Sequence, residues 1–144
     1  WRVDGAPLDI LIVDMPPGTG DAQLTMAQKV PLAGAVIVST PQDLALSDAR
    51  KGIEMFRKVG VPILGVIENM SVHVCSQCGH EEHIFGHGGA RAEAEKRGVP
   101  FLGEVPLHGA TRQAADEGRL HESTGPERPL FTAMAETLAA RLGI

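Results

Sequence analysis

The sequence predicts an α/β fold in which a mostly parallel sheet is covered by helices on both faces. Short apolar runs rich in β-branched residues recur along the chain, and stretches with apolar residues at helical spacing lie between them. Strands that are apolar along nearly their whole length are typical of a parallel sheet buried on both sides. The length of 144 residues fits a single domain, residues 1–144.

The first half of the chain alternates strand and helix. Leu8–Val13 is predicted to be a buried strand, and Asp21 is placed to cap a helix over about Ala22–Lys29. Gly34–Ser39 is a second buried run, and Asp43 precedes the next helix. The apolar residues of that helix are Leu46, Ala49, Ile53 and Phe56.

The second half repeats the pattern around a polar loop that contains both cysteines. Gly60 ends the preceding helix and Pro62 introduces a strand at Ile63–Glu68. The remaining predicted elements are a helix at Ala90–Arg97, a strand at Phe101–Val105, and helices near Thr111–Glu117 and Pro129–Leu142.

Composition excludes several classes of function. The net charge of −5 argues against a nucleic-acid partner, which requires clustered Lys and Arg. Apolar runs are shorter than a membrane span, so no membrane partner is expected. Two cysteines are too few for a disulfide scaffold, and a close pair is typical of a reducing compartment. We expect a cytoplasmic protein.

Polar residues follow three predicted strands, where ligands bind in parallel sheets. Asp14 is placed either to hold a water on Mg²⁺ or to cap the next segment. Asn69 either reads a purine edge or closes a turn. The turn Ser39–Asp43 either contacts a ligand or caps a helix. A Gly-x-x-x-x-Gly-Lys loop followed by Ser or Thr is missing, so this chain alone is not expected to bind ATP in the usual way.

Cys75 and Cys78 are the only cysteines, and two thiolates supply half of a four-ligand metal site. The other ligands come from nearby histidines, from a second copy of the chain or from a partner. The histidine alternative is a zinc knuckle made by Cys75, Cys78, His83 and His87. A redox dithiol is a further alternative, although such motifs usually open a helix.

Five motifs, in order along the chain, resemble the Mrp family, also called ApbC, of MinD-like deviant-Walker P-loop ATPases. They are Ile12-Val-Asp-Met-Pro-Pro-Gly-Thr-Gly-Asp21, Val38-Ser-Thr-Pro-Gln-Asp43, Glu68-Asn-Met-Ser71, Ile84-Phe-Gly-His-Gly-Gly-Ala-Arg91 and Phe101-Leu-Gly-Glu-Val-Pro-Leu107. The pair Cys75 and Cys78 adds to the resemblance. The family's Walker A loop would precede Trp1. The resemblance therefore implies the carboxyl-terminal part of such a protein, with one sheet edge left unpaired.

The resemblance also implies roles for single residues. Asp14 matches the Walker B aspartate of an ATP-hydrolysing, Mg²⁺-dependent site. Pro16, Pro17 and Gly18 match the switch that senses the terminal phosphate. Asn69 matches the adenine-side asparagine, and Pro106 begins a loop beside the base.

For the cysteine loop, about residues 70–89, the resemblance implies a 4Fe-4S cluster shared between the two subunits of a homodimer. Such a protein assembles or carries the cluster and transfers it to apo iron–sulfur proteins under ATP control. A two-fold dimer would complete a four-cysteine site with identical contributions. A MinD-type membrane-positioning role would need a basic amphipathic helix at the end of the chain. The helix predicted there has only Arg141 late in it.

Overall fold

A four-stranded sheet forms the centre of the computed structural model, which describes residues 2–16, 18, 20–122, 125 and 127–144. Strand β4 (Ile63–Val74) pairs in parallel with β3 (Ala35–Ser39) and with β6 (Phe101–Leu107). A short strand, β5 (Glu81–Glu82), pairs antiparallel with the far end of β4. The predicted mostly parallel sheet is confirmed.

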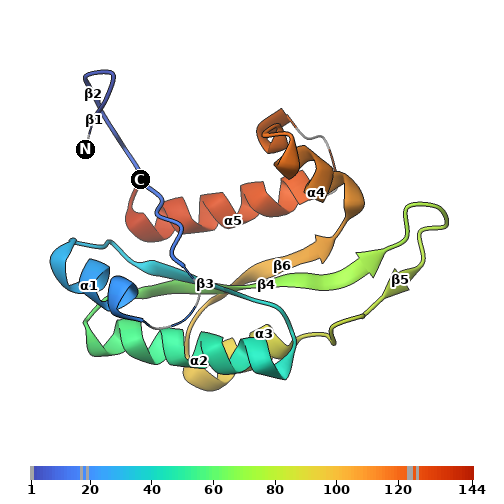
Figure 1. Ribbon diagram of the computed structural model, residues 1–144, viewed down its shortest axis with the longest axis horizontal. Helices are drawn as coiled ribbons and strands as arrows, with labels where there is room; N and C mark the ends of the chain where they lie inside the picture. The colour runs from blue at the N-terminus through green and yellow to red at the C-terminus, as the bar shows by residue number, and fades with distance from the viewer. Residues whose placement is uncertain (1, 17, 19, 123–124, 126) are drawn as a thin grey trace.

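Helices cover both faces of this sheet (Figure 1). Helix α2 (Asp43–Lys58) packs on β3 and α3 (Gly89–Arg97) on β4, on one face, whereas α5 (Glu127–Leu142) packs on β6 on the other. The remaining helical elements are α1 (Asp21–Lys29), α4 (Gly109–Asp116) and the 3₁₀ turn η1 (Leu120–Glu122). No helix within the described residues is both long and apolar enough to cross a membrane.

The main core lies between the sheet and helices α2 and α3. Ile53 of α2 is 1% exposed and Val66 of β4 is 2% exposed, and Ala90 and Ala94 of α3 are fully buried. The opposite face is closed differently. Gly103 of β6 has φ +153°, and a Cβ there would lie 2.6 Å from Cε of Met134 in α5. A glycine at this position therefore lets α5 approach the sheet closely.

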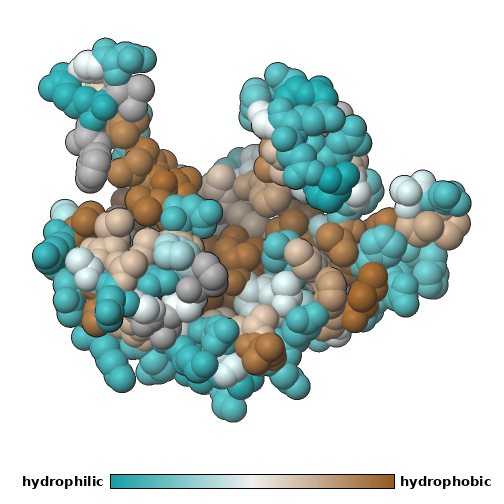
Figure 2. All heavy atoms as spheres, viewed as in Figure 1, coloured by the Kyte–Doolittle hydropathy of each residue, from teal (hydrophilic) through white to brown (hydrophobic). Residues whose placement is uncertain are grey.

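The predicted strand at residues 8–13 is wrong. Among the described residues this stretch pairs with no strand, and its apolar side chains are exposed, with Ile12 at 87%. The preceding hairpin, β1 (Arg2–Val3) with β2 (Ala6–Pro7), forms a separate two-stranded sheet in the described part of the chain. A strand needs a neighbour that accepts and donates backbone hydrogen bonds, and the described chain offers none here. Figure 2 shows the resulting apolar surface just below the hairpin.

Strand β4 is longer than predicted and carries the chain toward the cysteines. The prediction ended it at Glu68, but pairing resumes at His73, which faces Leu107 of β6 and Glu82 of β5. Between these stretches the register shifts, and Met70 adopts φ +56°. This irregularity bends the strand where the polar motif begins. Helices α1 to α5 lie close to their predicted positions.

Candidate functional site

The two cysteines lie in the turn that joins β4 to β5. The backbone N–H of Cys75 donates to the His80 carbonyl oxygen at 2.9 Å, and the N–H of Gly79 donates to the Cys75 carbonyl oxygen at 2.9 Å. Gly79 has φ +71°, a conformation that glycine adopts without strain. The hairpin thus closes around residues 75–80, with Cys75 half-buried and Cys78 exposed.

The turn favours the ionised form of Cys75. Backbone hydrogen bonds from Gln77 and Cys78, and then the Cys78 side chain, lower the pKa of the Cys75 thiol below its ordinary value of 9.0. The thiolate is the form that ligates metals and attacks electrophiles. The turn therefore favours the thiolate form of Cys75 and places a second, exposed thiol beside it.

The zinc-knuckle alternative is not supported by the geometry. Nδ1 of His83 lies 2.9 Å from the Ser71 carbonyl oxygen, so this histidine is held against β4. Its ring lies 4.4 Å from the ring of His87, centroid to centroid. Within the described residues, the one group of three or more metal-ligating side chains whose ligand atoms converge contains neither cysteine.

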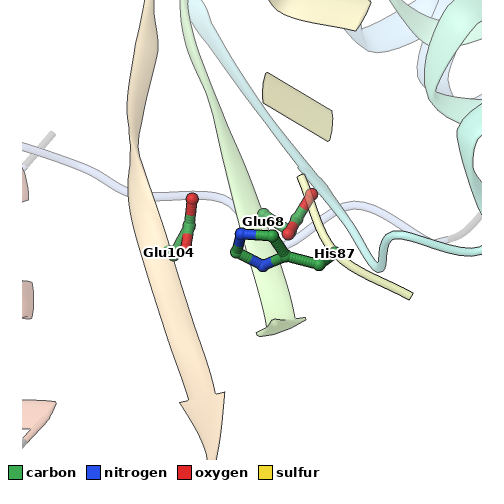
Figure 3. Close-up of side chains that lie close together, drawn as sticks. All are labelled: Glu68, His87 and Glu104. Atoms are coloured by element: carbon green, nitrogen blue, oxygen red, sulfur yellow. The ribbon is translucent and has the colours of Figure 1, made fainter. Parts of the chain in front are cut away.

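That group consists of Glu68, His87 and Glu104, whose ligand atoms lie within 4.8 Å of one another (Figure 3). Glu68 and Glu104 sit opposite each other in the β4–β6 register. Both carboxylates already have partners. Glu68 accepts two backbone N–H bonds, and Glu104 lies 3.1 Å from the Arg91 guanidinium. Sequence reasoning gave Glu68 and Glu104 no role in the site and considered His87 only as a zinc ligand beside the cysteines, although a carboxylate closing the apolar run 63–67 was a usable signal.

The residues predicted to contact phosphate lie on the exposed stretch before α1. Asp14 is exposed, and so are Pro16 and Gly18, the latter with φ +97°. The Pro16 carbonyl oxygen accepts a 2.7 Å hydrogen bond from Nε2 of Gln23, a buried residue of α1. This bond ties the turn to α1. Pro17 lies outside the described residues.

The residues predicted to face the base lie side by side on the neighbouring strands β4 and β6. Asn69 pairs in register with Val105, so Pro106 follows directly on the neighbouring strand. The side-chain oxygen of Asn69 accepts a hydrogen bond from the Met70 N–H at 2.9 Å. Nδ1 of His108 is buried without a hydrogen-bond partner among the described residues.

The turn Ser39–Asp43, which follows β3, provides no side-chain cap for helix α2. Helix α2 begins at Asp43 after Gln42, whose side chain forms no capping hydrogen bond. The hydroxyl of Ser39, which is 6% exposed, donates to the Thr40 carbonyl oxygen at 3.0 Å. This turn packs against the residues that start α3.

Known proteins resemble this chain over most of its length. It is 60% identical over 123 residues to an iron-sulfur cluster carrier protein of Pseudomonas fragi, covering 85% of this chain and 43% of the relative. It is 57% identical over 135 residues to the carrier protein of Escherichia coli K12, covering 94% and 36%. The mouse iron-sulfur cluster transfer protein NUBPL is 58% identical over 118 residues, covering 82% and 37%. The chain thus spans about two fifths of the length of these curated relatives.

A solved structure agrees with these sequence relatives. It is a nucleotide-binding protein from Archaeoglobus fulgidus, described as a complex with ADP and with cobalt. The TM-score is 0.72 at 41% identity, over 84% of this chain and 50% of that one. The ParA family, described as NUBPL iron-transfer P-loop NTPases, matches residues 2–141. These findings confirm the resemblance seen in the sequence motifs, and the chain belongs to this family of iron-transfer P-loop NTPases.

Proposed function

We propose that this chain is the cluster-binding part of an iron–sulfur carrier. In this proposal Cys75 and Cys78 ligate a 4Fe-4S cluster together with the same pair from a second copy of the chain. The observation that carries the proposal is the cysteine turn, which offers two thiols at the end of a hairpin. No other metal-ligating side chain of the described residues joins them in a converging group of three or more.

The exposure of the site fits a carrier. Cys78 is exposed, so a second copy can approach the turn and complete four thiolate ligands. A cluster bound between two copies is also accessible to a recipient. Apo iron–sulfur proteins are the recipients we propose, in agreement with the carrier and transfer names of the relatives. Free thiols that must accept a cluster suit a reducing compartment, and we propose the cytoplasm.

The experiment is anaerobic reconstitution of the chain with iron and sulfide. We expect about two iron atoms per chain, because one four-iron cluster is shared by two chains. Cys75→Ala and Cys78→Ala each remove a ligand and should abolish binding, whereas Ser76→Ala changes the same turn without removing a ligand and should retain it. Sedimentation should show the loaded form as a dimer. A monomer that holds one zinc ion and takes up no iron would rule out the shared cluster.

We further propose that the complete protein binds ATP with Mg²⁺, and that this chain supplies only part of that site. Asp14 would act on the Mg²⁺ side, with Pro16, Pro17 and Gly18 near the terminal phosphate. Asn69 and Pro106 would face the base, in agreement with the ADP bound by the Archaeoglobus relative. The phosphate-cradling loop with its lysine would come from the rest of the protein.

Isothermal titration tests whether this chain supplies only part of the ATP site. Isothermal titration of this chain with ATP and Mg²⁺ should show at most weak binding and no hydrolysis, because the main phosphate ligands are elsewhere. Micromolar affinity for this chain alone would contradict the proposal. In the complete protein, Asp14→Asn should lower Mg²⁺-dependent hydrolysis while leaving the thermal unfolding midpoint unchanged.

A further inference from the structure

Glu68 is a fully buried carboxylate at the end of the regular part of β4. Its Oε1 accepts the N–H of Gly88 at 2.9 Å, and its Oε2 accepts the N–H of Ala90 at 2.7 Å. It makes no ion pair with any described residue. Burying a charge costs several kcal/mol unless hydrogen bonds satisfy it. Two charge-assisted bonds at the N-terminus of α3 provide that compensation.

These two bonds, which we call the Glu68 clasp, hold the start of α3. The turn that follows β3 packs against the opposite side of the same segment. Gly88 is the residue before α3 and has φ +71°. At Gly89, a Cβ would lie 2.8 Å from the Pro41 carbonyl oxygen and 2.8 Å from Cδ1 of Leu46. The start of α3 is therefore fixed between Glu68 and the turn that follows β3.

The segment held by the clasp is the return arm of the cysteine hairpin. Contacts with β4 hold this arm between the cysteines and α3. Glu82 pairs with His73, and the His83 ring nitrogen bonds the Ser71 carbonyl oxygen. The His87 ring packs on His83 and lies between the Glu68 and Glu104 side chains in Figure 3. Because the chain is anchored at its far end by Glu68, movement of α3 would be transmitted along this arm to the turn.

A divalent cation between Glu68, His87 and Glu104 is the competing interpretation. Each Glu68 oxygen already accepts one N–H, and Glu104 is paired with Arg91. A cation would have to compete with that guanidinium. The hydrogen bonds explain the burial of Glu68 without a metal, so the clasp is the better account.

We propose that Glu68 is a positioning residue for the cysteine site: without touching the cluster, it fixes the return arm of the hairpin and joins it to the turn after β3. The inference rests on the proposed function, because its main readout is retention of a bound cluster. The turn after β3 is one of the strand ends for which the sequence left open either ligand contact or a helix cap. The clasp therefore places a buried connection between that end of the sheet and the cysteines.

The test compares Glu68→Gln with Glu127→Gln in the reconstituted protein. Glutamine keeps the size of the side chain but turns one acceptor into a donor that faces a backbone N–H, so one bond of the clasp is lost. Glu127 is also buried, at 1% exposure, but lies on α5 across the sheet. Both variants should lower the unfolding midpoint. Only Glu68→Gln should lose its iron to a chelator several-fold faster than wild type, at unchanged iron content after reconstitution.

The outcomes separate the two proposals. If wild type takes up no iron, the proposed function fails. Hydrogen exchange of the apo protein then still tests the clasp, because Glu68→Gln should speed exchange at Gly88 and Ala90 and leave β6 unchanged. Equal chelator rates for wild type and Glu68→Gln would overturn the inference, and so would equal acceleration by Glu127→Gln. If Glu68→Gln does not fold, Gly89→Ala perturbs the same segment and should also speed iron loss.

A cation site is also decided by measurement. A Cys75→Ala/Cys78→Ala variant removes the thiol ligands and leaves Glu68, His87 and Glu104 in place. We expect no stoichiometric Zn²⁺ binding by this variant in titration calorimetry. Stoichiometric binding that His87→Ala abolishes would show that Glu68, His87 and Glu104 form a metal site, and it would overturn the proposal that Glu68 acts through its two backbone hydrogen bonds.

Discussion

Residues 8–16 and the cysteine hairpin at residues 63–90 both carry specific motifs, but within the described chain only the hairpin is paired in a ladder. The hairpin has the β4–β5 ladder, the His83–Ser71 contact and the Glu68 clasp. Residues 8–13 have apolar side chains exposed to solvent and no ladder, and the motif after them is tied to α1 by the Gln23–Pro16 bond. The comparison separates a segment whose backbone is paired in a ladder from one that the described chain leaves unpaired.

Hydrogen exchange gives the largest expected contrast between the two regions. Amides of residues 8–13 should exchange on the timescale of an unprotected chain, because they have no ladder partner. The Val66 amide, which donates to the Pro100 carbonyl oxygen at 2.8 Å beneath the core, should exchange only by global opening. For a domain of ordinary stability this is a difference of roughly 10³-fold or more. Comparable protection at residues 8–13 would show that the segment pairs in solution.

The failed strand shows which part of the fold the sequence determines locally. The apolar runs of β3, β4 and β6 and the spacing in α2 were predicted correctly, and the run at residues 8–13 has the same composition. A helix satisfies its backbone within itself, whereas a strand depends on residues distant in sequence. Composition therefore predicts that residues 8–13 are able to form a strand, but only a neighbouring strand makes them one.

A matched pair of substitutions measures the same contrast between the two regions through the free energy of unfolding. Ile53→Ala removes a side chain that is 1% exposed and should cost about 2–5 kcal/mol of unfolding free energy, because it leaves a cavity against Val66 and Phe56. Ile12→Ala removes a side chain that is 87% exposed and should change stability by less than about 0.5 kcal/mol. Urea denaturation checks both. A large loss in Ile12→Ala would mean that residues 8–13 already pack in this chain.

In the candidate site, as in the fold, the sequence predicts features set by local spacing but not those set by contacts between distant residues. The spacing of Cys75 and Cys78 is a local signal, and the turn built from them follows from it. The role of Glu68 depends on Gly88, twenty residues further along the chain, and no short motif shows that pairing. The zinc alternative failed for a related reason: spacing along the chain does not show that His83 is turned to the Ser71 carbonyl oxygen.

The pH dependence of thiol alkylation tests whether the turn favours the thiolate form of Cys75. Because hydrogen bonds to Gln77 and Cys78 lower its pKa, the thiolate should persist to lower pH than in an ordinary cysteine. The rate of iodoacetamide labelling at Cys75, followed by mass spectrometry, should therefore rise with a midpoint below 9.0. Urea-unfolded protein is the control, and its midpoint should return to the ordinary value. Equal midpoints would mean that the turn does not lower the pKa of the Cys75 thiol.

The smallest expected effect concerns the ion pair that joins the two helices beside the hairpin. Glu93 of α3 lies 2.8 Å from the Arg50 guanidinium of α2 and 3.2 Å from that of Arg97. Hydrogen bonding to Arg50 lowers the pKa of Glu93 below its ordinary value of 4.5. Glu93→Gln should cost about 0.2–1 kcal/mol of unfolding free energy at neutral pH, and less at high salt.

The pH dependence of that loss has a definite sign. Since the folded-state pKa is lowered, the carboxylate stabilises the fold fully above 4.5, and this contribution disappears as pH falls through the folded value. The stability gap between wild type and Glu93→Gln should therefore close in acid. Glu95→Gln removes the same charge from an exposed position of α3 that has no ion pair among the described residues, so its gap should be near zero throughout. A gap for Glu93→Gln that persists in acid would assign the loss to packing, and the link between α2 and α3 would not be electrostatic.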